Sequence, residues 1–187
     1  MKRSLCINRL VVVAIVAAVA PWALVQLAYA GPSAPTVPTA IQIEAGNKVF
    51  LVGHADGVQI YSCNAAGAGY TWGLVAPRAN LYGDNGQLIA THFGGPTWQA
   101  TDGSYVVAKR IDGVVVDSTA IAWLKLEATS AVSGPDGGRL AGTTWIQRVA
   151  TTGGLAPPAS ECNADTVGTI KEIDYTADYY FWKRTGS

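Results

Sequence analysis

Short runs of alternating apolar and polar residues make up most of the chain after residue 40. The runs are "VQIYSC", "YTWGLVA", "QLIATHF", "SYVVAKR", "AIAWLKLEA", "TTWIQRVATT" and "IDYTADYYFWKR". A period of two places successive side chains on opposite faces of a strand. Each run therefore predicts a β-strand, and in the last one Tyr175, Ala177, Tyr179 and Phe181 share one side.

Turn signals separate these runs. Asp-Gly pairs begin at Asp56, Asp102, Asp112 and Asp136, and Asp84-Asn85-Gly86 is a near relative. Such pairs supply the positive φ angles that hairpin turns need, and Asp112-Gly113 is the clearest signal of this kind. After Ala30 no stretch sustains the spacing of an amphipathic helix for three turns. We predict one all-β, antiparallel domain over residues 41–187, closed as a sandwich or a barrel-like sheet.

The first thirty residues have the pattern of a signal peptide. Basic residues at Lys2, Arg3 and Arg9 precede a wholly apolar stretch over residues 10–20. Ala28-Tyr29-Ala30 then offers the small-x-small motif that signal peptidase accepts. An uncleaved membrane anchor is the alternative, but Pro21 and Gln26 interrupt the apolar run. We expect cleavage after Ala30 and a secreted or periplasmic protein.

The mature chain begins with a proline-rich stretch and is slightly acidic. Residues 31–40, "GPSAPTVPTA", predict an extended linker before the domain. The whole chain has 13 basic and 13 acidic residues, and cleavage removes three of the basic ones. This balance does not favour a nucleic-acid partner, and it gives no reason for binding to a membrane beyond the leader.

Two cysteines, Cys63 and Cys162, remain once Cys6 is removed with the leader. An even pair in an exported chain indicates a disulfide, with two free thiols as the alternative.

The stretch "HFGGPTWQATDG" holds the strongest candidate for chemistry. One interpretation is a tight corner capped by Trp98, with His92 hydrogen-bonded to loop backbone. The other is a catalytic pocket in which Asp102 orients His92, with Arg148 nearby either to bind a carboxylate or to brace backbone carbonyls. No G-x-S-x-G elbow, metal-ligand spacing or nucleotide-binding motif is present, so we predict no metal and no cofactor.

Aromatic residues are numerous in the expected sheet, and alternation sends them to both faces. Tyr180 and Trp182 project from the face opposite Tyr179 and Phe181. Together with Trp98 and His92 they are the candidates for a binding surface that takes a glycan or a small molecule. The competing interpretation is that these rings fill the core and cover the sheet.

Several blocks in this order resemble the domain-of-unknown-function family 3455, small exported proteins of bacteria and fungi. They include "YTWGLVAPRANL", "GQLIATHFGGPTWQATDGSYVVA" and "TTWIQRVATTGGLAPPASEC", and the resemblance runs from about Ala40 to Trp182. The resemblance supports the bridge between Cys63 and Cys162. The signature positions that it implies are His92, Gly94, Gly95, Pro96, Trp98, Asp102, Gly103, Trp123, Gln147, Arg148, Thr151, Gly153 and Gly154. It implies no activity.

Three functions are compatible with these observations. The first is a non-enzymatic extracytoplasmic binding or cell-surface module with an aromatic ligand surface. The second is a hydrolase-like or other enzyme centred on His92 and Asp102. The third is a structural envelope protein without a small ligand, for which the oligomeric state is open.

Overall fold

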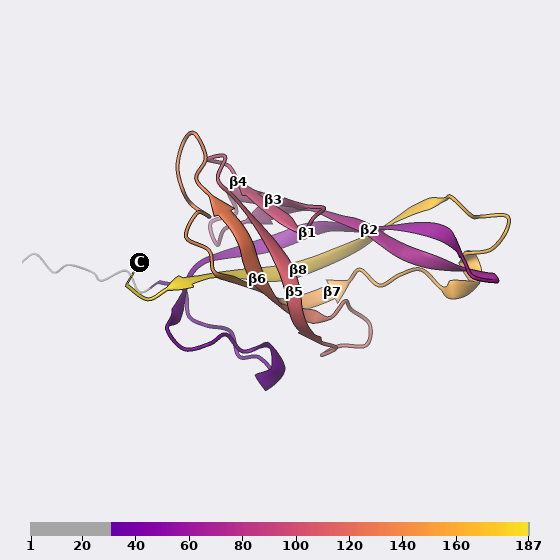
Figure 1. The fold of residues 1–187 in the computed structure, drawn as a ribbon, viewed down its shortest axis with the longest axis horizontal. Helices are drawn as coiled ribbons and strands as arrows, with labels where there is room; N and C mark the ends of the chain where they lie inside the picture. The colour runs from indigo at the N-terminus through magenta and orange to yellow at the C-terminus, as the bar shows by residue number, and fades with distance from the viewer. Residues whose placement is uncertain (1–30, 187) are drawn as a thin grey trace, which may run out of the picture. The chain divides into compact units, whose positions relative to one another are not determined.

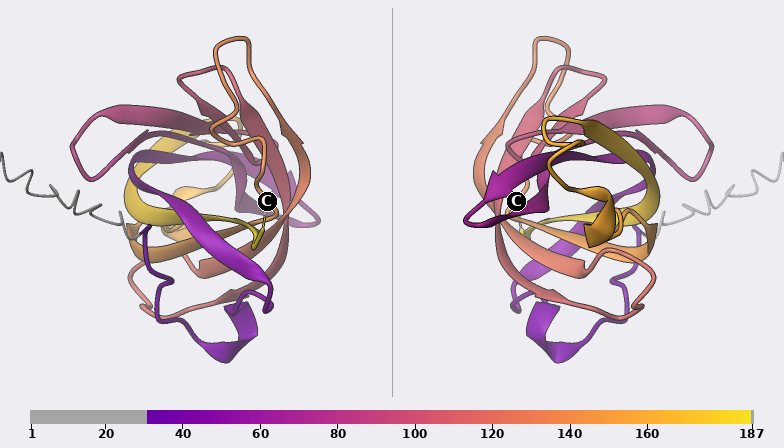
Figure 2. Two further views of the ribbon diagram at one scale, coloured as in Figure 1. Left: turned by 90° about the vertical axis from the view of Figure 1, so that its left-hand side faces the viewer. Right: turned by 90° about the vertical axis from the view of Figure 1, so that its right-hand side faces the viewer.

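A computed structural model describes residues 31–186, and these residues form one antiparallel sheet that closes on itself. The strands are β1 (Asn47–Ala66), β2 (Gly69–Tyr82), β3 (Leu88–Phe93), β4 (Thr97–Ala100), β5 (Tyr105–Val114), β6 (Trp123–Val132), β7 (Trp145–Gly153) and β8 (Ile170–Arg184). Each strand pairs with its neighbour in sequence, and β8 pairs with β1 (Figures 1 and 2). The predicted all-β, antiparallel class is confirmed, and of the two closures considered the single closed sheet is the one that forms. The signal peptide predicted for residues 1–30 lies outside the described residues.

Side chains that alternate along the strands fill the interior of the ring. On β8, Tyr175, Ala177, Tyr179 and Phe181 are all buried, which confirms that they share one side. Large rings at some positions face alanines at others, among them Ala79, Ala90, Ala100 and Ala108. An eight-stranded closed sheet has an interior just wide enough for such side chains. Its core is therefore built from a few large rings and many small partners.

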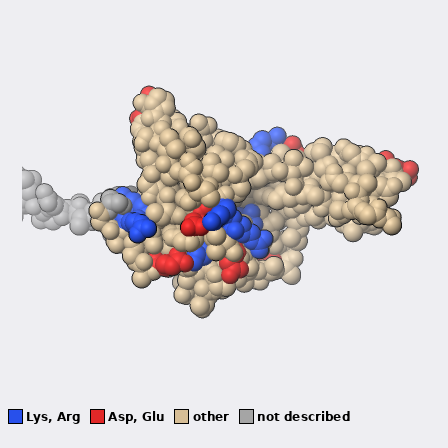
Figure 3. Space-filling view, viewed as in Figure 1, with Lys and Arg blue, Asp and Glu red and all other residues tan. Residues whose placement is uncertain are grey.

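Three strands continue past the ring as an extension (Figure 1). β2 pairs with β3 only from Ala79 onward, whereas β1 and β2 stay paired as far as Ala66 and Gly69. β8 likewise remains paired with β1 down to Ile170. The outer parts of β1, β2 and β8 thus form a three-stranded sheet of their own. On the face shown in Figure 3 this extension carries few charged side chains except near its tip.

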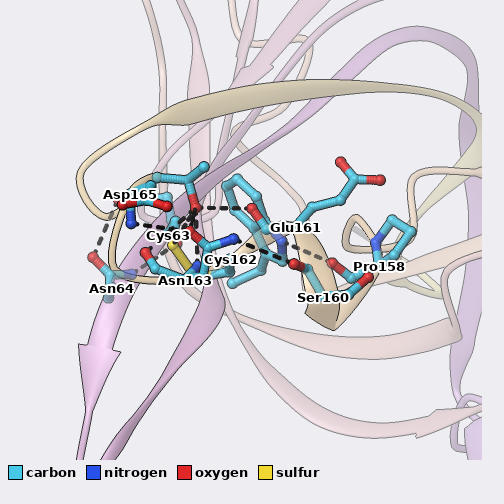
Figure 4. The surroundings of a disulfide bond; sticks show 11 residues. Cys63, Asn64, Pro158, Ser160, Glu161, Cys162, Asn163 and Asp165 are labelled. Atoms are coloured by element: carbon cyan, nitrogen blue, oxygen red, sulfur yellow. Dashed lines mark hydrogen bonds between the residues drawn. A yellow bond between two sulfur atoms is a disulfide. The ribbon is translucent and has the colours of Figure 1, made fainter.

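A disulfide joins the extension to the loop that precedes β8. Cys63 on β1 is bonded to Cys162, which follows the 3-10 turn η2 (Ala159–Glu161) (Figure 4). Tyr61 and Trp72 pack around the two sulfurs, and the Trp72 indole donates to the Pro158 carbonyl at 3.2 Å. The predicted pairing is confirmed. The bridge thus lies within a small core of the extension and cross-links it to the loop before β8.

Two of the turn predictions are confirmed. Gly86 and Gly103 adopt positive φ angles of 74° and 78°, in the β2–β3 and β4–β5 turns respectively.

Two other Asp-Gly pairs lie inside strands, so a turn was the wrong prediction for them. Gly57 is within β1, where an added Cβ would lie 2.2 Å from the Arg78 carbonyl oxygen of β2. Gly113 is within β5, next to a register shift between Arg110 and Asp112. Both glycines allow close approach of neighbouring groups. A glycine needed for close approach and a glycine needed for a positive φ angle look the same in the sequence. The true β5–β6 connection is residues 115–122.

The segment before β1 contacts the outer face of the ring. Residues 31–46 contain no strand, and their 3-10 turn η1 (Thr39–Ile41) ends at the fully buried Ile41. The Gln147 amide donates to the Ile41 carbonyl at 2.6 Å, and Glu44 forms an ion pair with Lys125. Ile41 and Glu44 therefore anchor the N-terminal end of the predicted domain to the ring.

Removal of the disulfide should destabilise the protein substantially. The bridge spans 99 positions, and cross-linking a loop of that size removes up to about 4.7 kcal/mol of denatured-state entropy. We expect Cys63→Ser/Cys162→Ser to lose about 2–5 kcal/mol of unfolding free energy in urea titrations. A reducing agent should lower the wild-type midpoint and leave the double variant unchanged. Equal midpoints for both proteins under oxidising conditions would contradict this.

His54 lies on the outside of the ring between two carboxylates. Its Nδ1 is 2.7 Å from Asp178 of β8, and its Nε2 is 2.9 Å from Asp84 of the β2–β3 turn. The hydrogen bonds to Asp84 and Asp178 raise the pKa of His54 above its usual 6.5. The imidazolium thus links β1, β8 and a turn.

The contribution of His54 to stability should depend on pH. A raised folded-state pKa means that the stabilisation is complete below about pH 6.5 and is lost as the pH rises through the folded value. Thermal unfolding of wild type and His54→Gln should therefore differ most near pH 5.5 and converge at alkaline pH. Added salt should shrink the difference, because the ring is 45% exposed. A gap that grows with pH would contradict this assignment.

Candidate functional site

A pocket of about 220 Å³ opens where the extension leaves the ring. Gln59 of β1 pairs with Pro77 of β2 at this junction, and both line the pocket. The full lining is Gln59, Leu74, Val75, Ala76, Pro77, His92, Gly94, Gly95, Pro96, Trp98, Arg110, Leu124, Leu126, Arg148 and Tyr179. Three sequence-predicted candidates, His92, Trp98 and Arg148, thus border one cavity.

The β3–β4 turn places His92 against Trp98. The two residues are register partners on adjacent strands, and Gly95 closes the turn with a φ of 95°. Their rings stack with centroids 4.1 Å apart and planes 6° from parallel. Tyr179 meets both rings edge-on, at 5.2 and 5.3 Å. The side chains are almost fully buried, so they form the rigid inner wall of the pocket.

His92 is a neutral residue of the pocket lining. Its Nδ1 lies 2.8 Å from the Thr97 carbonyl oxygen, which only accepts, so Nδ1 carries the proton. Burial lowers the pKa of His92 to about 3, and the positive charge of Arg148 acts in the same direction. The unprotonated Nε2 therefore keeps its lone pair at neutral pH. This hydrogen bond agrees with the first interpretation of the stretch, in which His92 is bonded to backbone at the corner.

Two buried donors in the lining have no partner among the described residues. They are Nε1 of Trp98 and Nε2 of Gln59, whose side chains are 1% and 2% exposed. A buried polar group without a partner costs about 1–3 kcal/mol. Such groups are rare in folded proteins and call for an explanation. Both belong to residues that line the pocket, but the two nitrogen atoms themselves have almost no accessible surface and so do not face its open space.

Arg148 has a structural role in this pocket and also adds charge to it. Its Nε and Nη2 both donate to the Ala122 carbonyl, at 3.1 and 2.8 Å, which ties β7 to the start of β6. This is the bracing role considered from the sequence. Arg110 reaches the same pocket from β5. The lining contains no aspartate or glutamate, so both charges are uncompensated within it.

Asp102 is held away from His92. Its Oδ1 accepts from Oγ and N of Ser104 at 2.6 and 3.0 Å, and its Oδ2 accepts from N of Arg139 at 2.8 Å. The Ser104 hydroxyl, then the Arg139 backbone, lowers the pKa of Asp102. The carboxylate organises the β4–β5 turn and does not line the pocket. Proximity in sequence does not become contact here because the β4 strand separates the two residues.

The four aromatic candidates do not form one surface. Trp98 and His92 face inward, whereas Tyr180 and Trp182 alternate to the outside with Gln147. The Trp182 indole donates to Oε1 of Gln147 at 3.0 Å, and its side chain is covered by the segment before β1. The interpretation that rings fill the core and cover the sheet holds for Trp98 and Trp182.

Sequence reasoning missed several lining residues, notably Gln59, Arg110 and Tyr179. Gln59 is a polar residue inside the run "VQIYSC" and was not singled out, although alternation places it on the same face as Tyr61 and Cys63, which are buried as well. Arg110 ends the run "SYVVAKR", where it resembles an ordinary exposed strand end. Alternation from Val106 through Ala108 does place it on the inner side.

A family model for "Protein of unknown function (DUF3455)" matches residues 44–183. The chain therefore belongs to this family of proteins of unknown function, as the sequence blocks indicated. No curated protein and no solved structure matches the chain. Within residues 31–186 no helix is long and apolar enough to cross a membrane. The same residues hold no group of His, Cys, Asp and Glu that would bind a metal ion.

Protonation of His92 should destabilise the folded protein in acid, whereas protonation of His54 stabilises it. Between about pH 6.5 and 3 the unfolded state binds a proton that the folded state refuses, so stability falls as the pH is lowered through this range. The stability gap between wild type and His92→Phe should shrink or reverse toward pH 4, since the phenyl ring keeps the stacking but cannot be protonated. Urea titrations across this range measure the gap. A folded His92 whose NMR resonances titrate near pH 6 would contradict the assignment.

Proposed function

We propose that this protein is a non-enzymatic extracytoplasmic binding module that holds one small molecule in the pocket at the end of its ring. The observation that carries the proposal is the composition of the pocket, whose lining joins apolar side chains to the guanidinium groups of Arg110 and Arg148 and includes no acidic residue. A ligand with acceptor atoms and an apolar body would match both parts of this lining.

The rest of the lining supports a small ligand with an apolar body. Leu74, Val75, Pro77, Leu124 and Leu126 supply apolar surface around the few polar groups. This mixture is typical of small-molecule sites, in which a few polar groups fix orientation. The volume of about 220 Å³ is below the roughly 300–1,000 Å³ of sites for drug-sized molecules. A glycan platform has less support, because stacking on a sugar needs an open ring face and Trp98 is enclosed.

Export is part of the proposal. The leader pattern in residues 1–30 and the disulfide between Cys63 and Cys162 both fit an oxidising compartment outside the cytoplasm. Secretion or periplasmic residence would expose the pocket to small molecules from the surroundings.

An enzyme centred on His92 and Asp102 has weaker support. General base catalysis needs a base whose pKa lies near the working pH and a neighbour that orients it. The pKa of His92 is about 3, and its orienting partner is the Thr97 carbonyl. No described hydroxyl or thiol is hydrogen-bonded to His92 as a nucleophile would be.

A pocket-filling variant tests the proposal. Ala76→Phe places a ring at the mouth, and Thr71→Phe adds the same ring on the extension, where Thr71 is exposed and does not line the pocket. Ligand-observed NMR of wild type with a panel of benzoate, octanoate, benzyl alcohol, 2-naphthol and N-acetylglucosamine should give saturation transfer to at least one probe. Ala76→Phe should abolish that signal, and Thr71→Phe should keep it. Silence for every probe, or equal signals in both variants, would refute a binding pocket.

A further inference from the structure

We propose that the ligand is a small organic anion of the carboxylate class, with its charge at Arg148 and Arg110 and its apolar body against the accessible lining residues Leu74, Val75 and Leu124. This inference rests on the proposed function and adds the chemical class of the ligand. It is carried by the charge distribution in the lining, where two guanidinium groups meet no acidic side chain.

The two pocket arginines differ from four other cations of the domain, which have an acidic partner. Arg78, Lys109, Lys125 and Lys171 each form an ion pair with a glutamate. Within residues 31–186 neither Arg110 nor Arg148 forms an ion pair. Arg148 is partly buried, where water solvates a charge poorly and an opposite charge is attracted more strongly. An anion that enters the pocket would supply this missing counter-charge.

The hydrogen bonds of Arg148 leave donors for a ligand. A guanidinium has five N–H donors in a rigid fork, which matches two oxygens of a carboxylate. Bonds from Nε and Nη2 to the Ala122 carbonyl use two of these donors and fix the plane of the group. Nη1 and the second hydrogen of Nη2 point along the other edge of the fork, and because Arg148 also interacts with the Tyr179 hydroxyl, about two of the five donors remain for a ligand. The brace thus pre-orients the charge instead of consuming it.

The strand irregularity in β5 brings Arg110 to the pocket. An added Cβ on Gly113 would lie 2.7 Å from Nη2 of Arg110 and 2.7 Å from Cδ2 of Leu124. The missing side chain therefore makes room for the guanidinium beside a pocket leucine. Arg110 is exposed and lies at the rim, so it would attract an anion, whereas Arg148 would hold it inside.

The charges in the lining point to the same ligand chemistry. His92 is neutral, because burial lowers its pKa to about 3, so it adds no charge to the pocket. The two guanidinium groups therefore dominate the electrostatics of the lining. A cation would meet two arginines and no carboxylate, so the pocket selects against it.

Calorimetric titration with three naphthalene probes tests the charge preference. The probes are 2-naphthoate, 2-naphthamide and 2-naphthylmethylammonium, which share the aromatic body and differ in charge. We expect wild type to bind the naphthoate at least tenfold more tightly than the amide and to show no binding of the ammonium. Raising the salt concentration should weaken naphthoate binding and leave amide binding unchanged.

Matched variants on one strand locate the charge. Arg110→Gln should weaken naphthoate binding several-fold, whereas Lys109→Gln, which removes the same charge from the opposite face of β5, should not. Arg148→Gln should abolish the preference for naphthoate over the amide. Because Arg148 also braces the Ala122 carbonyl, its replacement alters the structure as well as the charge, whereas Arg110→Gln changes the charge at a residue without that bracing role.

The outcomes separate this inference from the proposed function. If the three probes bind wild type equally and Ala76→Phe abolishes binding, the pocket stands and the anion inference falls. The anion inference also falls if Lys109→Gln and Arg110→Gln weaken naphthoate binding equally, since the effect would then be long-range. If neither these probes nor the wider panel bind, both proposals fall.

Discussion

The pairing of β1 with β8 is the constraint on which the rest of the structure depends. It runs from Asn47 opposite Arg184 to Ser62 opposite Ile170, and it joins the two ends of the domain. Without it the other strands would be an open sheet with two long unpaired edges. Closure converts one face of that sheet into an interior. The buried rings of Trp98, Tyr179 and Phe181 have an inside to occupy only because the ring is closed.

The same pairing explains why a pocket forms where it does. β1 and β8 are longer than the strands opposite them, so their outer ends leave the ring together with β2 and form the extension. At the point of departure the sheet no longer surrounds its interior, and one side opens. Gln59 and Pro77 lie at that point, and the β3–β4 turn and the ends of β5 and β6 complete the rim. The disulfide stabilises the extension beyond this point and so holds the strands that border the open side of the ring.

Alternation made most of the fold predictable from sequence. It assigned the strands and the inward face of β8, because burial of one face forces a period of two. It could not identify which neighbours in space would complete a site. Asp102 lies ten residues from His92 and faces another turn, whereas Gln59 and Arg148 come from distant strands and share its pocket. Which residues meet in space depends on the register of the strands and on the closure of the sheet, and the local alternation of apolar and polar residues specifies neither.

The errors in turn prediction are instructive because they adjoin the pocket. Asp56-Gly57 and Asp112-Gly113 have the sequence of hairpin turns, yet both glycines lie within strands that approach a neighbour closely. Gly57 is two residues before Gln59, and Gly113 lies against Arg110 and Leu124. Real sequences tend to break local rules at functional or strained positions. A glycine that weakens a strand interior without forming a turn needs a compensating benefit. At Gly113 that benefit is the space in which the Arg110 guanidinium reaches the pocket rim. The glycine that was wrongly predicted to form a turn therefore supports the charge on which the proposed ligand class depends.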